Sequence, residues 1–141
     1  MNILFIDNNP THNIFWEDLM PMLFPQSTQQ FCTLDNWEAV FNSNKREMVI
    51  FFSSSIKEEV EKIADRCKSE KVSFLCVVDD YTIKEFQLLL DNNVQGLIQT
   101  STTSLKEIKE IIDLIMNGGF YLKAPSKELV QANPYIIVAL K

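Results

Sequence analysis

The sequence predicts an α/β fold, in which helices cover both faces of a parallel five-stranded sheet in a single doubly wound domain. Short apolar runs alternate with amphipathic helical patterns five times along the 141 residues, a length that suits one domain. The apolar runs are typical of strands buried on both faces. The connections from strand to helix are short, which favours right-handed βαβ units.

The run from Met48 to Phe52 organises the predicted sheet. Its five residues are all apolar, and three serines follow it directly. A parallel sheet carries its chemistry in the crevice beyond the carboxyl ends of its strands. At that edge this strand offers Phe52 and Ser53, with no carboxylate, histidine or cysteine. Much of the functional interpretation depends on this composition.

Five strands are expected, each an apolar run that ends at polar or turn-forming residues. The second of them has the weakest pattern. In chain order, they cover residues 2–6, 29–33, 48–52, 72–78 and 94–98.

Five helices are expected to follow these strands. The first opens at Pro10 and Thr11, and Pro21 should kink it or end it early. A capping box, in which an Asp, Ser or Thr precedes a Glu by three residues, begins each of the other four. The last helix should stop at Gly118 and Gly119. The four capping boxes start at Asp35, Ser55, Thr82 and Ser104.

The chain is expected to divide into a domain over residues 1–123 and an extension or linker over residues 124–141. Residues 120–122 form a brief extended piece, and residues 126–132 have a helical pattern of two turns. Residues 135–140 form a last apolar run. It could be the first helix of an output domain, a dimer contact or an added edge strand, and the pattern does not rank these roles.

Composition argues against several functional classes. The formal net charge of −6 argues against this segment gripping DNA or an anionic membrane by itself. The three cysteines form no CxxC pair, and Cys32 and Cys76 lie in apolar runs, where they are expected to be small buried hydrophobic residues. The sequence has no apolar run of membrane-spanning length and no signal-peptide pattern at its start. A reducing, cytoplasmic compartment is therefore expected.

The order and spacing of these units resemble a response-regulator receiver domain, most closely receivers of the NarL/LuxR type of transcription regulator. The motifs that carry the resemblance are ILFID at residues 3–7, VQGLI at residues 94–98 and NGGFYL at residues 117–122. The resemblance covers roughly residues 1–123. The resemblance implies a flavodoxin-like fold and a role in bacterial two-component signal transduction.

In that family two acids after the first strand hold Mg²⁺, and an Asp at the end of the third strand accepts a phosphoryl group from a histidine kinase. A Ser or Thr and a Lys from the next two strands contact that group. The resemblance places the acid pair at Asp7 and Asn8, so one acid is replaced by an amide. It places the phosphoryl acceptor at Phe52, or at Ser53 if the register slips by one residue.

The two remaining family positions depart from the pattern as well. The hydroxyl position falls on Cys76 or Val77, and the lysine position falls on Thr100. A Phe cannot take a phosphoryl group, and without the lysine an added charge lacks its cationic partner. The resemblance therefore implies a degenerate receiver that is not phosphorylated on Asp. We expect no enzymatic activity and no cofactor, Mg²⁺ included.

Other polar residues have ordinary structural interpretations. Asp79 and Asp80 are expected to start a loop and cap the next helix. Residues 53–55 are expected to cap a helix, since they lack the glycine of a phosphate-binding loop. His12 is expected to be a surface residue at a helix start.

Three functions of different classes follow. The first is a phosphorylation-independent receiver that forms homodimers through the face around its fourth helix, fifth strand and fifth helix, and controls a DNA-binding output module outside this chain. The second is a module that binds a small ligand or a second protein in a pocket lined by Asp7, Ser53, Asp79 and Thr100. The third is a relic phosphoryl or metal enzyme centred on Asp7, Asp79 and Asp80. We adopt the first as the prediction.

Overall fold

The computed structural model describes residues 1–7, 10–53 and 59–123, with the backbone alone described at residues 10–14. Five parallel strands form one sheet in the order β2-β1-β3-β4-β5, which is the flavodoxin-like order. The predicted fold class is confirmed. The strands are β1 (Asn2–Ile6), β2 (Thr28–Cys32), β3 (Met48–Ser53), β4 (Ser73–Val78) and β5 (Gly96–Gln99).

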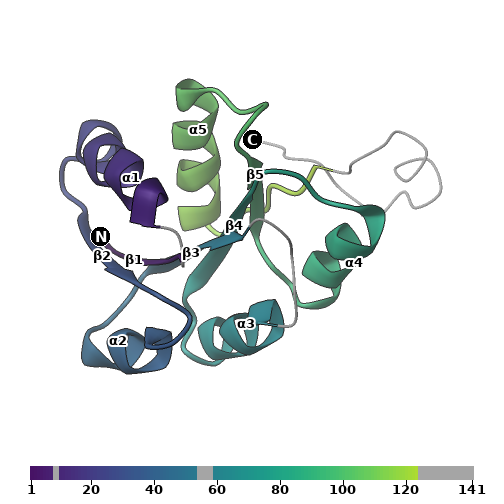
Figure 1. Cartoon of the computed structure of the whole chain (residues 1–141), viewed down its shortest axis with the longest axis horizontal. Helices are drawn as coiled ribbons and strands as arrows, with labels where there is room; N and C mark the ends of the chain where they lie inside the picture. Colours follow the sequence, from purple (N-terminus) through teal and green to yellow (C-terminus); the bar gives the residue numbers. More distant parts are fainter. Residues whose placement is uncertain (8–9, 54–58, 124–141) are drawn as a thin grey trace.

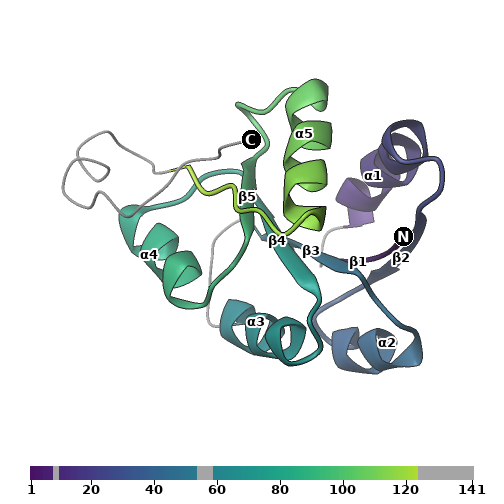
Figure 2. The ribbon, with the colours of Figure 1, turned by 180° about the vertical axis from the view of Figure 1, so that it is seen from behind.

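Helices cover both faces of this sheet (Figure 1). One face carries α1 and α5, and the other carries α2, α3 and α4, as the view from behind also shows (Figure 2). Within the described part of the chain, no helix is long and apolar enough to cross a membrane. The helices are α1 (Pro10–Leu23), α2 (Trp37–Ser43), α3 (Glu59–Ser69), α4 (Ile83–Asp91) and α5 (Leu105–Met116).

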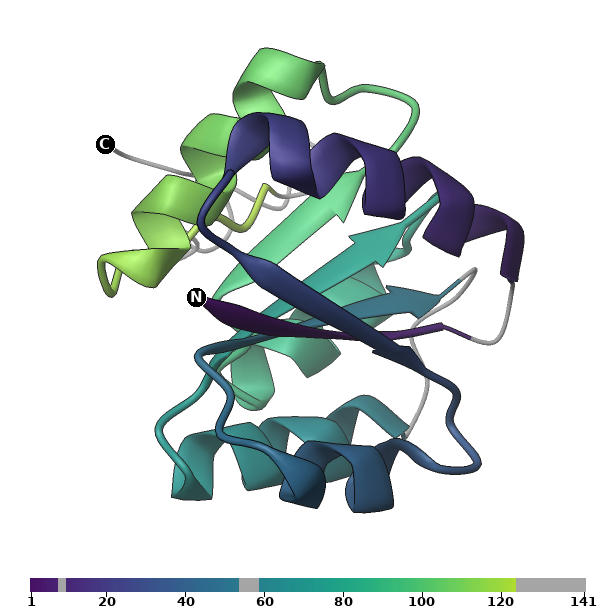
Figure 3. The ribbon, with the colours of Figure 1, turned by 90° about the vertical axis from the view of Figure 1, so that its left-hand side faces the viewer.

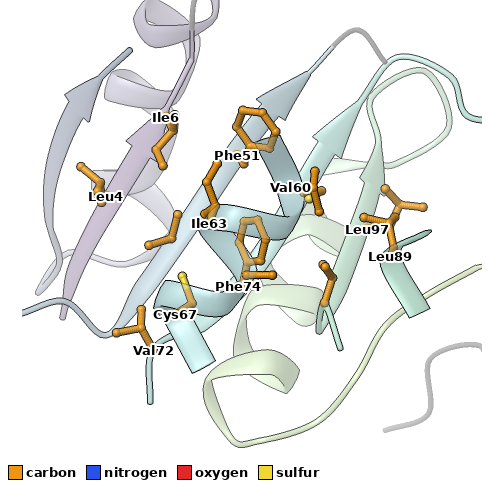
Figure 4. Close-up of a cluster of buried hydrophobic side chains, with 14 of the residues drawn as sticks. Leu4, Ile6, Phe51, Val60, Ile63, Cys67, Val72, Phe74, Leu89 and Leu97 are labelled. Carbon is orange, nitrogen blue, oxygen red and sulfur yellow. The ribbon is translucent and has the colours of Figure 1, made fainter. Parts of the chain in front are cut away.

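Strand β3 lies at the centre of the sheet and is buried on both faces. It pairs with β1 on one side and with β4 on the other. Because successive side chains of a strand point to opposite faces, Val49 and Phe51 enter one core, and Met48, Ile50 and Phe52 enter the other. Figure 4 shows the first of these cores, where Phe51 lies among residues of β4 and α3.

The capping boxes predicted at Thr82 and Ser104 are confirmed. The Oγ1 of Thr82 accepts a hydrogen bond from the backbone N–H of Glu85 at 3.1 Å, and the Glu85 carboxylate accepts from the Thr82 N–H at 2.9 Å. Ser104 and Glu107 make the same pair of bonds at 3.2 and 3.3 Å. These boxes fix the first turns of α4 and α5. The box predicted at Ser55 lies outside the described residues.

The capping box predicted at Asp35 is wrong. Helix α2 begins one residue later, its N-cap residue is Asn36, and no side chain caps it. The Oδ1 of Asn36 instead accepts a hydrogen bond from the backbone N–H of Thr33 at 2.9 Å. A local turn therefore uses the side chain that would otherwise cap the helix.

The expectation that Pro21 would end α1 early is also wrong. Pro21 lies inside the helix, which continues to Leu23. In the last turn, a proline removes the backbone donor that would reach the carbonyl four residues earlier, and its ring crowds that carbonyl. The helix therefore continues past Pro21 with one backbone hydrogen bond fewer.

The extended piece predicted at residues 120–122 contacts β5. The N–H of Tyr121 donates to the carbonyl of Gln95 at 2.7 Å, and the N–H of Leu97 donates to the carbonyl of Tyr121 at 2.9 Å. Leu122 is buried in the core. The predicted helix at residues 126–132 and the apolar run at residues 135–140 lie outside the described residues. The proposed division of the chain at residue 123 therefore stays a prediction.

Gly96, the first residue of β5, has no room for a side chain. A Cβ at this position would overlap the Cδ1 of Ile115 and lie 2.5 Å from the Cδ1 of Leu75. We expect Gly96→Ala to lower the free energy of unfolding by about 1–3 kcal/mol, because a packed core must shift to accept the methyl group. Urea unfolding followed by circular dichroism measures the change.

The matched control is Ser101→Ala, in the exposed loop that follows β5. It should change the free energy of unfolding by less than about 0.5 kcal/mol. Equal losses in the two variants would contradict the packing argument.

Candidate functional site

The carboxyl end of β3 carries a buried aromatic side chain. Because Ile6 of β1 lies opposite Phe51 of β3, Asp7 and Phe52 follow side by side at the ends of these strands. The ring of Phe52 is edge-on to Trp16 at 5.3 Å between centroids, and it lies 6.0 Å from Phe5. Aromatic pairs of this kind contribute about 0.5–1.5 kcal/mol beyond the area they bury. Phe52 is therefore held in the core by α1 and β1.

Asp7 is buried beside this cluster, with only 4% of its surface exposed. Its backbone N–H donates to the carbonyl of Cys32 at 2.9 Å, which extends the pairing of β1 with β2 by one residue. Its predicted partner Asn8 lies outside the described residues.

Of the two residues predicted at the Mg²⁺ position, Asp7 lies within the described residues. The ion needs near-octahedral oxygen coordination, for which carboxylates are the usual protein ligands. Within residues 1–7, 10–53 and 59–123, no three His, Cys, Asp or Glu side chains lie close enough to hold a metal. At the end of β3, where the sequence analysis predicted the acceptor position, the ring of Phe52 packs against Trp16.

A cavity of about 250 Å³ opens at the carboxyl edge of the sheet. Its walls come from α1, the ends of β3, β4 and β5, and the start of α5. Most of the described lining residues are apolar, and Asp79 is the one charged residue among them. The lining residues are Phe15, Trp16, Phe52, Ser53, Val77, Val78, Asp79, Ile98, Thr100, Thr103, Leu105 and Ile108.

Two of these residues form a hydrogen-bonded polar edge of the cavity. The Oγ1 of Thr100 donates to the Oδ1 of Asp79 at 3.2 Å, and the Thr100 N–H donates to the carbonyl of Val78 at 3.0 Å. The side-chain amide of Gln99 donates to the carbonyl of Asp79 at 3.2 Å. These bonds tie the loop after β4 to the loop after β5.

The cavity gathers only some of the residues predicted to form the degenerate phosphorylation pocket. Phe52, Ser53 and Thr100 line it, whereas Asp7 and Cys76 do not. Cys76 is fully buried on the opposite face, where it lies in the core with Phe51. Val77, the alternative to Cys76, faces the cavity.

The prediction that Asp79 and Asp80 cap the next helix is wrong. The N-cap of α4 is Thr82, so neither aspartate caps that helix. Asp80 accepts a hydrogen bond from the N–H of Tyr81 at 2.8 Å, whereas Asp79 holds Thr100 at the cavity. The side chain of His12 lies outside the described residues.

Sequence reasoning missed the contribution of the helices to this cavity. Trp16 and Ile108 were expected on helices but not at the strand ends. Phe15 and Leu105 are apolar residues at the mouth of the cavity, and their exposed fractions are 51% and 50%. In the sequence they differ from the other apolar residues of their helices in no visible way. A helical pattern shows only that a residue faces a core, and here the cavity and the core share one face.

The cysteines do not offer a reactive thiolate. Burial raises the pKa of the Cys32 thiol to about 11, although the charge of Arg46 partly offsets this effect. Burial also raises the pKa of Cys67 to about 12, and it raises that of Cys76 further. Because the thiolate is the reactive form, a raised pKa makes these thiols less reactive. Cys32 and Cys76 are buried small hydrophobic side chains, as predicted.

Comparisons with known proteins support the fold. No protein-family model matches the sequence, and no curated protein matches it. Among solved structures, 29 chains match. The RcsB response regulator of Salmonella typhimurium is 9% identical with a TM-score of 0.72, covering 99% of this chain and 72% of its own.

A LuxR-family DNA-binding response regulator from Silicibacter pomeroyi is 13% identical with a TM-score of 0.74, and the match covers 87% of this chain and 97% of that one. The chain has the receiver fold. A third neighbour with this fold is an atypical orphan response regulator described as having a phosphorylation-independent mechanism. It is 16% identical with a TM-score of 0.65, and the match covers 85% of this chain and 98% of that one.

We predict that the three thiols do not react in the native protein. At a pH of about 8, below the ordinary thiol pKa, a thiol-specific disulfide reagent should label all three in denaturant but should label native protein only at the rate of unfolding. Absorbance of the released thiolate measures this. Fast labelling of any one thiol in native protein would contradict the packing.

The raised pKa of Cys32 also determines how the free energy of unfolding depends on pH. The folded state holds the Cys32 proton up to a pKa of about 11, against an ordinary value of 9.0. The stability that this group contributes is complete below pH 9 and is lost as the pH rises through about 11.

Proposed function

We propose that this domain is a non-enzymatic receiver-type signalling module that works without aspartyl phosphorylation. The observation that carries the proposal is the position of Phe52, which lies near the carboxyl end of β3 beside Asp7 and is packed between Trp16 and Phe5. A side chain in that position fills the space where an acceptor carboxylate and its metal would have to lie.

The charges around the cavity support the same proposal. A phosphoryl group needs cations to neutralise its charge. Among the described lining residues there is Asp79 but no Lys or Arg, and the hydroxyl of Thr100 already donates to that carboxylate. An anion placed there would meet the like charge of Asp79.

We propose further that the domain belongs to a transcription regulator and contacts DNA only through an output module outside this chain. The net charge of −6 argues against direct DNA binding by the domain itself. Two of its structural neighbours are described as DNA-interacting or DNA-binding response regulators. The three buried free cysteines support the cytoplasm as its compartment.

A thermal unfolding scan tests the central proposal. Beryllofluoride with Mg²⁺ mimics a phosphorylated aspartate, and binding to the native state must raise the melting temperature by mass action. If a functional phosphorylation site is present, beryllofluoride at about 100 times its dissociation constant would raise the melting temperature by roughly 5–10 °C. We expect no shift in the wild type, measured by differential scanning calorimetry.

The control for this scan is Asp7→Asn, compared with the wild type in the same buffers. A clear shift in the wild type that disappears in Asp7→Asn would overturn the proposal, because it would show that a metal and phosphoryl site survives beside Phe52.

We also propose that the module forms a constitutive homodimer through the α4–β5–α5 face. This face presents Ile83, which is 52% exposed, together with the mixed charges of α4 and α5. We expect Ile83→Lys to raise the dimer dissociation constant by at least about tenfold, since a charge would replace apolar contact. Sedimentation velocity over a concentration series measures this.

The matched control for Ile83→Lys is Met22→Lys on α1, on the other side of the sheet. Met22 is 75% exposed, so this variant adds the same charge to another apolar surface position. A wild type that stays monomeric at high concentration would contradict the dimer. Equal weakening by the two variants would show that another surface is used.

A further inference from the structure

We propose that the cavity at the carboxyl edge of the sheet binds a small, flat aromatic molecule of about the size of indole, either neutral or positively charged. The proposal rests on the proposed function in one respect, since ligand binding would be the signal that replaces phosphorylation. The class of ligand is inferred from the size, the lining and the charge of the cavity.

The volume of the cavity sets the size of the ligand. An apolar cavity of about 150 Å³ accommodates benzene, a single ring. The cavity here, at about 250 Å³, has room for a molecule with two fused rings. It is too small for a nucleotide or a packed helix, because drug-sized ligands and larger groups occupy pockets of about 300–1,000 Å³ or more.

The walls of the cavity favour an aromatic ligand. Three of the lining side chains are the aromatic rings of Phe15, Trp16 and Phe52. Trp16 lies edge-on to both other rings, with centroids at 5.8 Å from Phe15 and 5.3 Å from Phe52. Rings set at these angles present both edges and faces, so a flat ligand can make stacked and edge-on contacts at once.

The polar edge of the cavity decides the charge of the ligand. Among the described lining residues, Asp79 is the one that carries a charge, and it is exposed beside Thr100. A carboxylate has about four acceptor positions, so Asp79 can hold Thr100 and still accept a hydrogen bond from a ring N–H, a hydroxyl or an ammonium group. A ligand carboxylate or phosphate would be repelled.

The mouth of the cavity lies between α1 and α5, so a bound ligand would contact both helices. Phe15 on α1 and Leu105 at the start of α5 are each about half exposed and line the cavity from different helices. A ligand between them would cover both side chains and would join α1, the sheet and α5. Covering such exposed apolar surface stabilises the bound state.

Isothermal titration calorimetry with three probes tests the proposal on the full chain. The probes are indole, which is neutral, tryptamine, which carries an ammonium group, and indole-3-acetate, which carries a carboxylate. We expect indole and tryptamine to bind, and indole-3-acetate to bind at least about tenfold more weakly than tryptamine.

Two pairs of variants locate the binding. Leu105→Trp should fill the mouth of the cavity and weaken indole binding by at least about tenfold. Its control is Met22→Trp, which adds the same ring at an exposed apolar residue of α1 that is not among the lining residues. Asp79→Asn should remove the preference for tryptamine over indole-3-acetate, whereas its neighbour control Asp80→Asn should keep it.

The proposal is overturned if indole and tryptamine do not bind at concentrations up to about 1 mM. It is also overturned if Leu105→Trp and Met22→Trp have equal effects on indole binding. The beryllofluoride scan uses no indole, so a failure of the proposed function is read separately from a failure of this inference.

Discussion

The structure depends on the double burial of β3. This strand pairs with both β1 and β4, and its side chains enter two cores that α1 and α5 cover on one face and α2, α3 and α4 on the other. Figure 3 shows this layering from the side, with the sheet between its helices. A strand with no solvated face has nowhere to place a charge except at its end. The composition of the end of β3 therefore decides what chemistry the sheet can carry.

At that end β3 carries an aromatic side chain rather than a charged one. An acidic pocket needs solvent, metal or cations to offset the desolvation of its carboxylates. Here the ring of Phe52 contacts Trp16 and Phe5, and Asp7 is buried next to it. The aromatic contacts stabilise the position of the Phe52 ring. The neighbouring space is apolar as well, because Val77 of β4 and Ile98 of β5 also face it.

The polar groups that remain at the sheet edge serve to position the loops. Thr100 holds Asp79, and the amide of Gln99 holds the backbone at the same residue, so the loops after β4 and β5 are joined. These loops lead into α4 and α5, whose first turns are fixed by their own capping boxes. The cavity therefore lies between helices and strands that are joined by hydrogen bonds. Such connected elements can transmit a change at the mouth of the cavity to α4 and α5.

The sequence by itself determined the layers of the protein. Apolar runs specified the five strands, and local hydrogen bonds specified the starts of α4 and α5, because both depend on residues close together in the chain. The same local logic failed at Asp35, where Asn36 bonds to Thr33 instead of capping the helix.

Only the tertiary structure decided which residues meet at the strand ends. A shift of one residue moves a strand side chain to the other face, so the choice between Cys76 and Val77 depended on the register of β4 against β3. The cavity itself depends on how five separate elements pack, which no single stretch of sequence encodes. The absence of a carboxylate at Phe52 was visible in the sequence, whereas the apolar space beside it came from the packing of α1 and α5 against the sheet.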